Sequence, residues 1–149
     1  MKPYPINETK PALAQEMLCK YETPASNRML LIMEANKGVR VNALYDLVYI
    51  SGHKKDFFAD LLNLSVKTID RYKRESKKLN PSNSEMVLKL FVLYKKGNEV
   101  FGSISAFNNW LDKPAFGLGS SAPVAFMHTS GGIDLILEEL SRIEYGDLA

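Results

Sequence analysis

Residues 55–74 read KDFFADLLNLSVKTIDRYKR, and this stretch decides the fold. It holds two short amphipathic segments with a very short connection between them. Asn63 stands at the turn, where most such motifs have glycine because the backbone needs positive φ, and Asn is the next most tolerant residue type. Ser65 follows as a good N-cap for the second segment. The stretch therefore predicts a helix-turn-helix.

The apolar residues of this stretch are spaced as two crossing helices require. Ala59 supplies a small side chain in the first helix, where the second helix must cross closely. We expect the first helix over residues 55–62 and the second over residues 65–77. The side chains expected to face inward are Phe58, Leu62, Leu64, Ile69 and Tyr72.

The second helix carries a stripe of cations. At about 100° per residue, Ile69, Tyr72 and Ser76 cluster on one side of the helix. The cations that fall on the opposite side are Lys67, Arg71, Arg74 and Lys78. Such a stripe suits phosphates and guanine edges. We therefore expect these four residues to bind DNA, together with Ser65 and Thr68 at the start of the helix. The alternative is a plain helical hairpin whose outer face is basic.

The net charge of the chain hides a strong asymmetry. The 149 residues carry 19 Lys and Arg against 17 Asp and Glu, a formal charge of +2. Residues 53–78 alone have a net charge of +4, and residues 130–149 have a net charge of −4. Opposite charges on two segments suggest two different partners, although solvated helix surfaces also carry charge.

Composition excludes several classes of protein. One cysteine and two histidines cannot form an intramolecular disulfide framework or a structural zinc site of the usual kind. No apolar run approaches the ~18 residues of a membrane span, and the N-terminus has no signal-peptide core. We expect a cytoplasmic protein with no membrane contact, no metal and no cofactor.

Helical patterns dominate the chain, so the expected fold class is all-α. Residues 1–28 hold four of the seven prolines and predict an extended N-terminal arm, with at most a short helix over residues 12–21. We expect a helix-turn-helix module over residues 29–79 and a small helical domain over residues 80–149. The further helices are expected at residues 41–50, 84–97, 105–111 and 132–145, and residues 28–37 read as a helix or a strand.

Punctuating residues set the ends of the helices expected after residue 79. Pro81 is expected to break the chain, and Gly97 to follow the end of the helix over residues 84–97. Phe101, Phe107, Trp110 and Leu111 predict a small core for the second domain.

No catalytic constellation is found. His128 and Cys19 lack the partners that an acid–base or nucleophilic site needs. His53 lies in the loop before the helix-turn-helix, where we expect it near phosphates rather than in a catalytic role. The letters of residues 117–122, GLGSSA, fit a dinucleotide fingerprint, but no strand precedes them and Pro123 follows at once. An enzyme that uses this loop is a remote alternative, and we expect no catalytic residues.

A series of short elements follows in order from Leu79 onward: Ser84-Glu85, Glu99-Val100-Phe101-Gly102, Trp110-Leu111 with Pro114, Leu118-Gly119, Pro123, Thr129 with Gly132, and Leu140 with Ile143-Glu144-Tyr145-Gly146. In these elements the chain resembles the toxin-binding domain of the Xre/MbcA/ParS antitoxins of bacterial toxin–antitoxin operons. With the helix-turn-helix before it, the resemblance covers roughly residues 29–149. Two departures are Met86, where many members have Arg, and a less Leu-rich run over residues 124–127.

The resemblance implies a function. Relatives neutralise toxins with a RES domain, which consume NAD or transfer ADP-ribose from it, and cover the active-site cleft with their C-terminal part. They also repress their own operon as homodimers on operator DNA. Carried over to this sequence, the toxin contacts are Glu138, Glu139, Arg142, Glu144, Tyr145, Gly146, Asp147, Leu148 and Ala149.

The charge of the C-terminal tail is consistent with that role. A cleft that accepts a dinucleotide presents cations to its phosphates. An acidic tail can take the place of those phosphates, Tyr145 offers a flat ring, and Gly146 lets the tail turn off the helix axis. The alternatives are a frayed, solvated tail, and a stand-alone transcription regulator whose second domain dimerises or senses a ligand.

Overall fold

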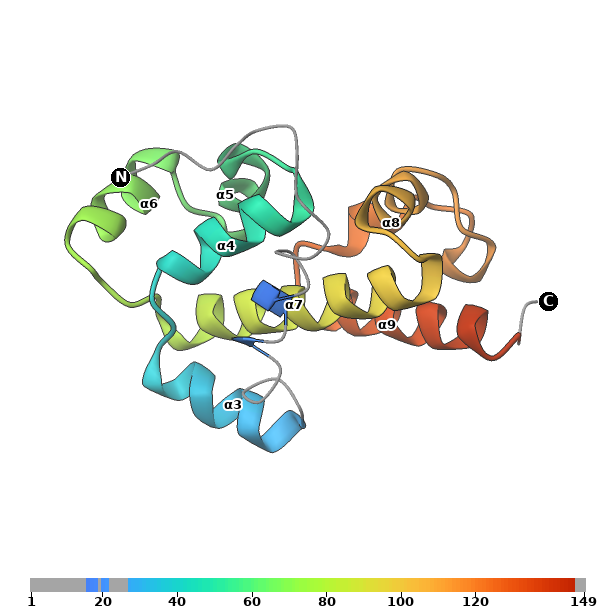
Figure 1. The fold of residues 1–149 in the computed structure, drawn as a ribbon, viewed down its shortest axis with the longest axis horizontal. Helices are drawn as coiled ribbons and strands as arrows, with labels where there is room; N and C mark the ends of the chain where they lie inside the picture. The colour runs from blue at the N-terminus through green and yellow to red at the C-terminus, as the bar shows by residue number, and fades with distance from the viewer. Residues whose placement is uncertain (1–15, 19, 22–26, 147–149) are drawn as a thin grey trace. The chain divides into compact units, whose positions relative to one another are not determined.

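The computed structural model describes residues 16–18, 20–21 and 27–146 (Figure 1). Over these ranges the chain forms helices and two isolated antiparallel bridges, Arg40 with Lys78 and Ala115 with Ser121, and no strand. The expected all-α class is confirmed. No helix of these ranges is both long and apolar enough to cross a bilayer.

The packing divides the chain into two compact units, Met1–Phe91 and Val92–Ala149. The division falls inside the longest described helix, α7 (Pro81–Phe101), so each unit takes part of this helix. From the sequence we expected the second domain to begin at residue 80, before this helix rather than within it.

The first unit is built around α4 (Asn42–Ser51), most of whose residues are buried. Leu44, Leu47 and Ile50 of this helix are fully buried. The ambiguous stretch over residues 28–37 is a helix, and the Asn27 side chain caps it by accepting a hydrogen bond of 2.8 Å from the Leu30 amide. The helices of this unit are α3 (Arg28–Lys37), α4 (Asn42–Ser51), α5 (Lys55–Leu62), α6 (Val66–Arg74) and the first part of α7.

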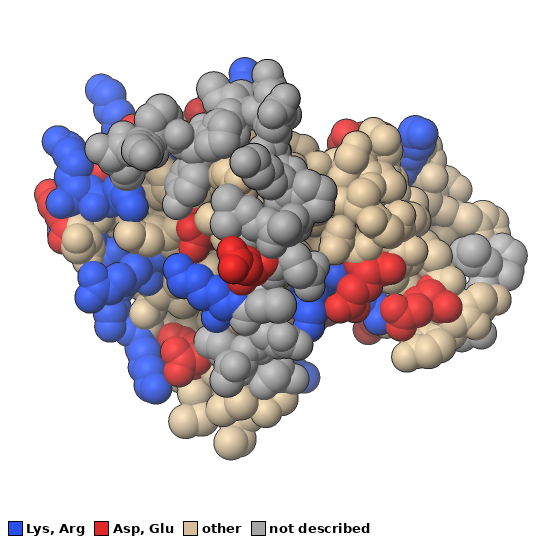
Figure 2. All heavy atoms as spheres, in the orientation of Figure 1, with Lys and Arg blue, Asp and Glu red and all other residues tan. Residues whose placement is uncertain are grey.

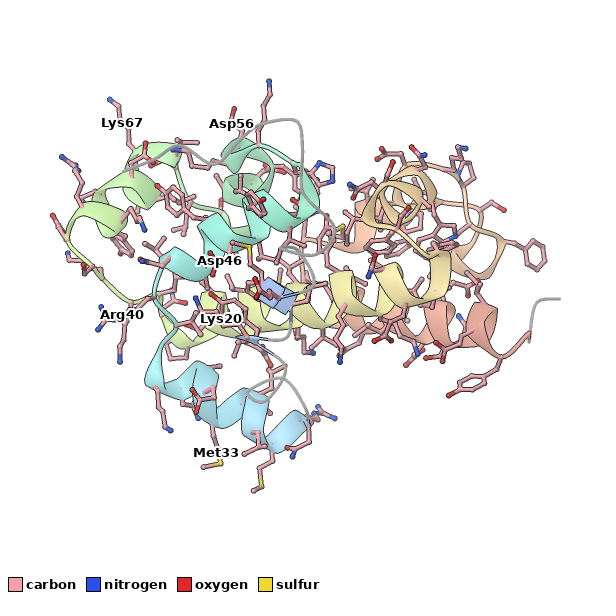
Figure 3. The ribbon with its side chains drawn as sticks, in the orientation of Figure 1. Lys20, Met33, Arg40, Asp46, Asp56 and Lys67 are labelled. Carbon is pink, nitrogen blue, oxygen red and sulfur yellow. The ribbon has the colours of Figure 1, made fainter. Side chains whose placement is uncertain are left out.

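A short N-terminal segment packs on the first unit. Leu18 is buried, and the ring of Tyr21 stacks on Phe91 with 3.8 Å between centroids. The hydroxyl of Tyr21 and the ammonium of Lys20 both donate to the buried carboxylate of Asp46 (Figure 3). Most of the expected arm over residues 1–28 lies outside the described residues.

The second unit has an aromatic core, as the sequence predicts. Phe107 is fully buried and lies 5.3 Å from Tyr94, 6.2 Å from Phe101 and 6.1 Å from Trp110, measured between ring centroids. The elements of this unit are the second part of α7, α8 (Ile104–Leu111), the 3₁₀ helices η1 (Phe116–Leu118) and η2 (Pro123–Phe126), and α9 (Ser130–Glu144).

Two predictions about helix ends are wrong. Pro81 does not break the chain but is the first residue of α7, a position where a missing N–H costs nothing. Gly97 does not follow the helix but lies inside it, and α7 continues to Phe101. A Cβ at position 97 would come within 2.3 Å of the Phe107 ring, so this glycine allows Phe107 to pack against the helix.

Candidate functional site

The turn of the helix-turn-helix has the predicted geometry. Asn63 adopts the left-handed conformation, with φ 55° and ψ 44°, and the next amide, that of Leu64, donates to the Ala59 carbonyl at 2.9 Å. The hydroxyl of Ser65 accepts a hydrogen bond of 3.0 Å from the amide of Thr68, as an N-cap does. The two helices are therefore set by the residues that the sequence singled out.

The interior of this motif is close to the prediction. Phe58, Ala59, Leu62 and Ile69 are buried, which gives α5 and α6 their shared core. Leu64 and Tyr72, which were also expected to face inward, are half-buried.

Asp70 braces α6 against two other helices. Its Oδ1 accepts a hydrogen bond of 2.8 Å from the Tyr45 hydroxyl of α4 and one of 2.7 Å from the Lys55 ammonium of α5. The hydrogen bond from Lys55, and then that from Tyr45, lowers the pKa of Asp70 below its ordinary value. Burial, and then the hydrogen bond to Asp70, raises the pKa of Tyr45 well above its usual range. Sequence analysis did not single out Asp70, because its partners lie 15 and 25 residues away along the chain.

The Tyr45 ring also lies under two cations. The Nζ atoms of Lys55 and Lys73 are 5.3 and 5.1 Å from its centroid. Cation–π contacts of this kind add to the hydrogen bonds of Asp70 in fixing the orientation of α6. Sequence reasoning assigned no role to Tyr45, Lys55 or Lys73.

Three of the predicted cations form one exposed face of α6. We call Lys67, Arg71 and Arg74 the α6 cationic face. With Thr68 and Asp70, and counting described residues only, they line a surface hollow of about 380 Å³. Figure 2 shows Lys and Arg side chains gathered around α6 at the left of the view, and in Figure 3 Lys67 extends away from the helix. Among the described residues none of the three forms an ion pair within 4.0 Å, but the charge of Arg74 helps to lower the pKa of Asp70, four residues earlier.

The prediction that Lys78 completes this face is wrong. The helix wheel assumed a helix through residue 77, but α6 ends at Arg74 and Ser76 has a left-handed φ of 53°. Lys78 instead forms the isolated bridge with Arg40, and its ammonium donates to the Lys37 carbonyl at 3.5 Å. The chain thus leaves the helix one turn earlier than the charge pattern indicates.

The start and the buried side of α9 are fixed by η2. The hydroxyl of Thr129 accepts a hydrogen bond of 3.0 Å from the Gly132 amide and caps the helix. A Cβ at Gly132 would lie 1.8 Å from the Phe126 carbonyl oxygen, so only glycine permits this close approach. Ile133 and Leu140 face the core.

Glu139 and Arg142, two of the residues predicted to contact the toxin, form an ion pair with each other. Glu139 is only 3% exposed, and its Oε2 accepts hydrogen bonds from Nε and Nη2 of Arg142 at 2.9 and 2.6 Å. A Cβ at Gly117 of η1 would lie 1.9 Å from the same oxygen. Glu139 therefore joins α9 to η1 from inside the unit, while the Arg142 side chain stays partly exposed.

The remaining predicted contacts lie at the end of α9. Glu138, Tyr145 and Gly146 are exposed, and Glu144 forms an ion pair of 2.7 Å with Lys96 of α7. Gly146 has a φ of 73° and donates its amide to the Ile143 carbonyl, so it ends the helix as predicted. Asp147, Leu148 and Ala149 lie outside the described residues.

The weaker chemical candidates have ordinary surroundings. The His53 ring stacks on Phe57 with centroids 4.2 Å apart. A turn closed by the bridge of Ala115 with Ser121 holds the glycine-rich loop, and no strand precedes this loop in the described chain. Among the described residues no three His, Cys, Asp or Glu side chains are grouped to hold a metal.

The comparison with known families bears on the second unit. Residues 96–146 match the family model of the antitoxin Xre/MbcA/ParS C-terminal toxin-binding domain, over about a third of the chain. The match begins within α7, ends just after α9 and includes both η1 and η2. The search of curated proteins found no match. The resemblance noted in the sequence is thereby confirmed for residues 96–146, which are similar to the toxin-binding domain of the Xre/MbcA/ParS antitoxins.

Proposed function

We propose that this protein is an antitoxin that neutralises a NAD-consuming RES-domain toxin and represses its own operon as a homodimer on operator DNA. The observation that carries the proposal is the combination of two units in one chain. One contains a toxin-binding domain at residues 96–146, and the other a helix-turn-helix with an exposed cationic face. A protein that binds operator DNA and a NAD-consuming toxin would act in the cytoplasm, and the proposal places it there.

Toxin neutralisation is assigned to the exposed end of α9 and the tail that follows it. Residues 130–149 have a net charge of −4, and Glu138 and Tyr145 are exposed at the end of the helix. An acidic segment suits a cleft whose cations normally hold the phosphates of a dinucleotide. The antitoxin acts here as a plug and performs no chemistry. Glu139 and Arg142 support it by fixing the orientation of α9.

Removal of the tail tests the plug. A chain lacking residues 144–149 is mixed with the RES-domain protein encoded beside its gene, and NAD consumption is measured. We expect the toxin to regain activity, whereas removal of residues 1–11 from the opposite terminus leaves inhibition unchanged. Inhibition that persists at the level of the full chain would refute the plug.

DNA binding is assigned to the α6 cationic face and the start of α6. Lys67, Arg71 and Arg74 supply charge for phosphates and guanine edges, and Thr68 lies near the helix start, where recognition helices contact bases. Ser65 caps the helix and donates or accepts one further hydrogen bond of 2.8 Å with the Thr68 hydroxyl. Lys78 lies off the helix, and we leave it out of the base-contacting set.

A second copy of the chain is needed for tight operator binding, because one half-site is too small an interface for high affinity. The exposed face of α3 supports this part of the proposal. Met29, Ile32 and Met33 lie at helical spacing and are 70%, 39% and 47% exposed. Exposed apolar clusters mark interaction sites. The variant Met33→Glu is expected to shift the mass of the protein in solution from dimer to monomer, measured by light scattering.

A stand-alone transcription regulator is the alternative, because the helix-turn-helix alone would suit it. In that case the second unit dimerises or senses a ligand and binds no toxin. Co-purification with the product of the neighbouring gene separates the two: a stable complex supports the antitoxin, and its absence supports the regulator.

A further inference from the structure

Phe116 of η1 is the most exposed large apolar side chain of the described chain, at 76%. Its neighbours behave differently, since Ala115 and Leu118 are buried at 6% and 7%. The loop therefore has an inward anchor on both sides and one aromatic ring directed to the solvent. Contact between a hydrophobic ring and water is unfavourable, so a partner that buries the ring would gain binding free energy.

The loop that carries Phe116 is closed by its own backbone. The Ala115 amide donates to the Ser121 carbonyl at 3.0 Å, and the Ser120 amide donates back to the Ala115 carbonyl at 3.0 Å. Gly119 and Ser120 both adopt left-handed conformations, with φ of 66° and 62°. A non-glycine residue in this region is uncommon and requires support from its surroundings. Phe116 is thus held on a tight loop rather than on a free segment.

The loop packs against α9 at the buried Glu139. Gly117, the next residue, lies directly against the carboxylate of Glu139, and Arg142 binds the same carboxylate. At helical spacing Leu135, Glu138 and Arg142 share one side of α9. Leu135 is 44% exposed. Phe116 thus lies one residue from the point where η1 meets α9, and we call Phe116, Leu135 and Glu138 together the η1–α9 surface.

We propose that the η1–α9 surface is part of the toxin interface and that Phe116 is its anchor, inserted into an apolar pocket of the toxin. The proposal rests on the proposed function, and it adds a contact outside the acidic tail. Both elements lie within the matched toxin-binding domain. The exposed acid Glu138 of α9 complements the cations expected around a phosphate-binding cleft.

The physical reason for an aromatic anchor is the low entropy cost of ordering it. Most of the binding energy at protein interfaces comes from a few buried side chains, and aromatic residues are enriched among them. A ring on a loop already closed by hydrogen bonds loses little further freedom on binding. The partner is therefore a folded protein with an apolar pocket rimmed by basic side chains.

The test measures the affinity of the full-length chain for the RES-domain protein encoded beside its gene. We expect Phe116→Ala to weaken binding at least tenfold and Ser105→Ala, an exposed change on α8 of the same unit, to leave it unchanged. A photo-crosslinking benzophenone amino acid at position 116 should form a covalent product with the toxin, and the same group at position 105 should not. Because Phe116 is exposed, its replacement leaves the fold intact, which circular dichroism verifies.

The outcomes separate this inference from the proposed function. The inference alone is overturned if the wild-type chain binds the toxin, Phe116→Ala binds it equally well, and position 116 yields no cross-link. A wild-type chain that does not bind the toxin overturns the proposed function and the inference together.

Discussion

The Arg142 guanidinium donates two hydrogen bonds to one oxygen of the buried Glu139 carboxylate, three residues earlier on α9. The same oxygen lies against the backbone of Gly117. One carboxylate thus holds together a helix and the loop that presents Phe116. Two residues that the sequence assigned to partner contact serve first to order the domain.

Replacement of Glu139 should destabilise the protein. Glu139→Ala removes both hydrogen bonds and leaves a gap beside Gly117, so we expect a loss of about 1–3 kcal/mol in the free energy of unfolding. Urea denaturation measures it. Glu138→Ala, an exposed acid one residue earlier, is the control and should change stability by less than about 0.5 kcal/mol. Equal stability of the two variants would contradict a structural role for Glu139.

The brace at Asp70 should make stability depend on acid pH. Lys55 and Tyr45 lower the folded-state pKa of Asp70 below its ordinary 3.8, so the ionised form stabilises the fold. This contribution is complete above pH 3.8 and is lost as the pH falls through the lower folded-state pKa. The urea midpoint of Asp70→Asn should lie below that of wild type at pH 6, and the gap should narrow toward pH 2.5. A gap that does not change with pH would exclude the brace.

The cationic face of α6 should set the salt dependence of DNA binding. Arg74→Ala removes one cation, and the slope of log affinity against log salt should decrease by about 1 if Arg74 contacts a phosphate. The probe is a duplex from the region upstream of the gene. Lys113→Ala, the same charge change in the second unit, should leave the slope unaltered. Toxin binding by Arg74→Ala should match that of wild type.

The hydrogen bond from Tyr21 to Asp46 should stabilise the first unit. Tyr21→Phe keeps the stacking on Phe91 but removes one donor from a buried carboxylate, which should cost about 1–3 kcal/mol. Thermal or urea unfolding measures this loss. Tyr145→Phe alters a 75% exposed ring and should have no effect. If both variants unfold alike, the hydrogen bond from Tyr21 to Asp46 does not stabilise the fold.

Local sequence patterns predicted the helix-turn-helix well. The turn at Asn63, the cap at Ser65 and the buried Ile69 depend on neighbours within a few residues, and periodicity and capping rules describe such interactions. The aromatic core around Phe107 was predicted for the same reason, since its members lie close together in the chain.

Helix ends were predicted less well, because distant residues decide them. The wheel extended α6 to residue 77, but the bridge between Lys78 and Arg40 draws the chain away after Arg74. From the sequence alone Gly97 predicts the end of a helix. In the structure it lies inside α7, where the lack of a side chain leaves room for the Phe107 ring. Arg40 is far from Lys78 along the chain, and Phe107 is more than one helical turn from Gly97, so local patterns do not include these contacts.

The sequence by itself determined the all-α class, the helix-turn-helix, the resemblance of residues 96–146 to a toxin-binding domain, and the opposite net charges of residues 53–78 and 130–149. These follow from residue types and short spacings, which act through local backbone preferences and net charge. Only the tertiary structure decided which charged residues face solvent and which hold the fold together. Asp70 and Glu139 look like surface acids in the sequence, yet each finds its partners by packing between elements. Burial and hydrogen bonding across elements depend on three-dimensional proximity, which no local pattern encodes.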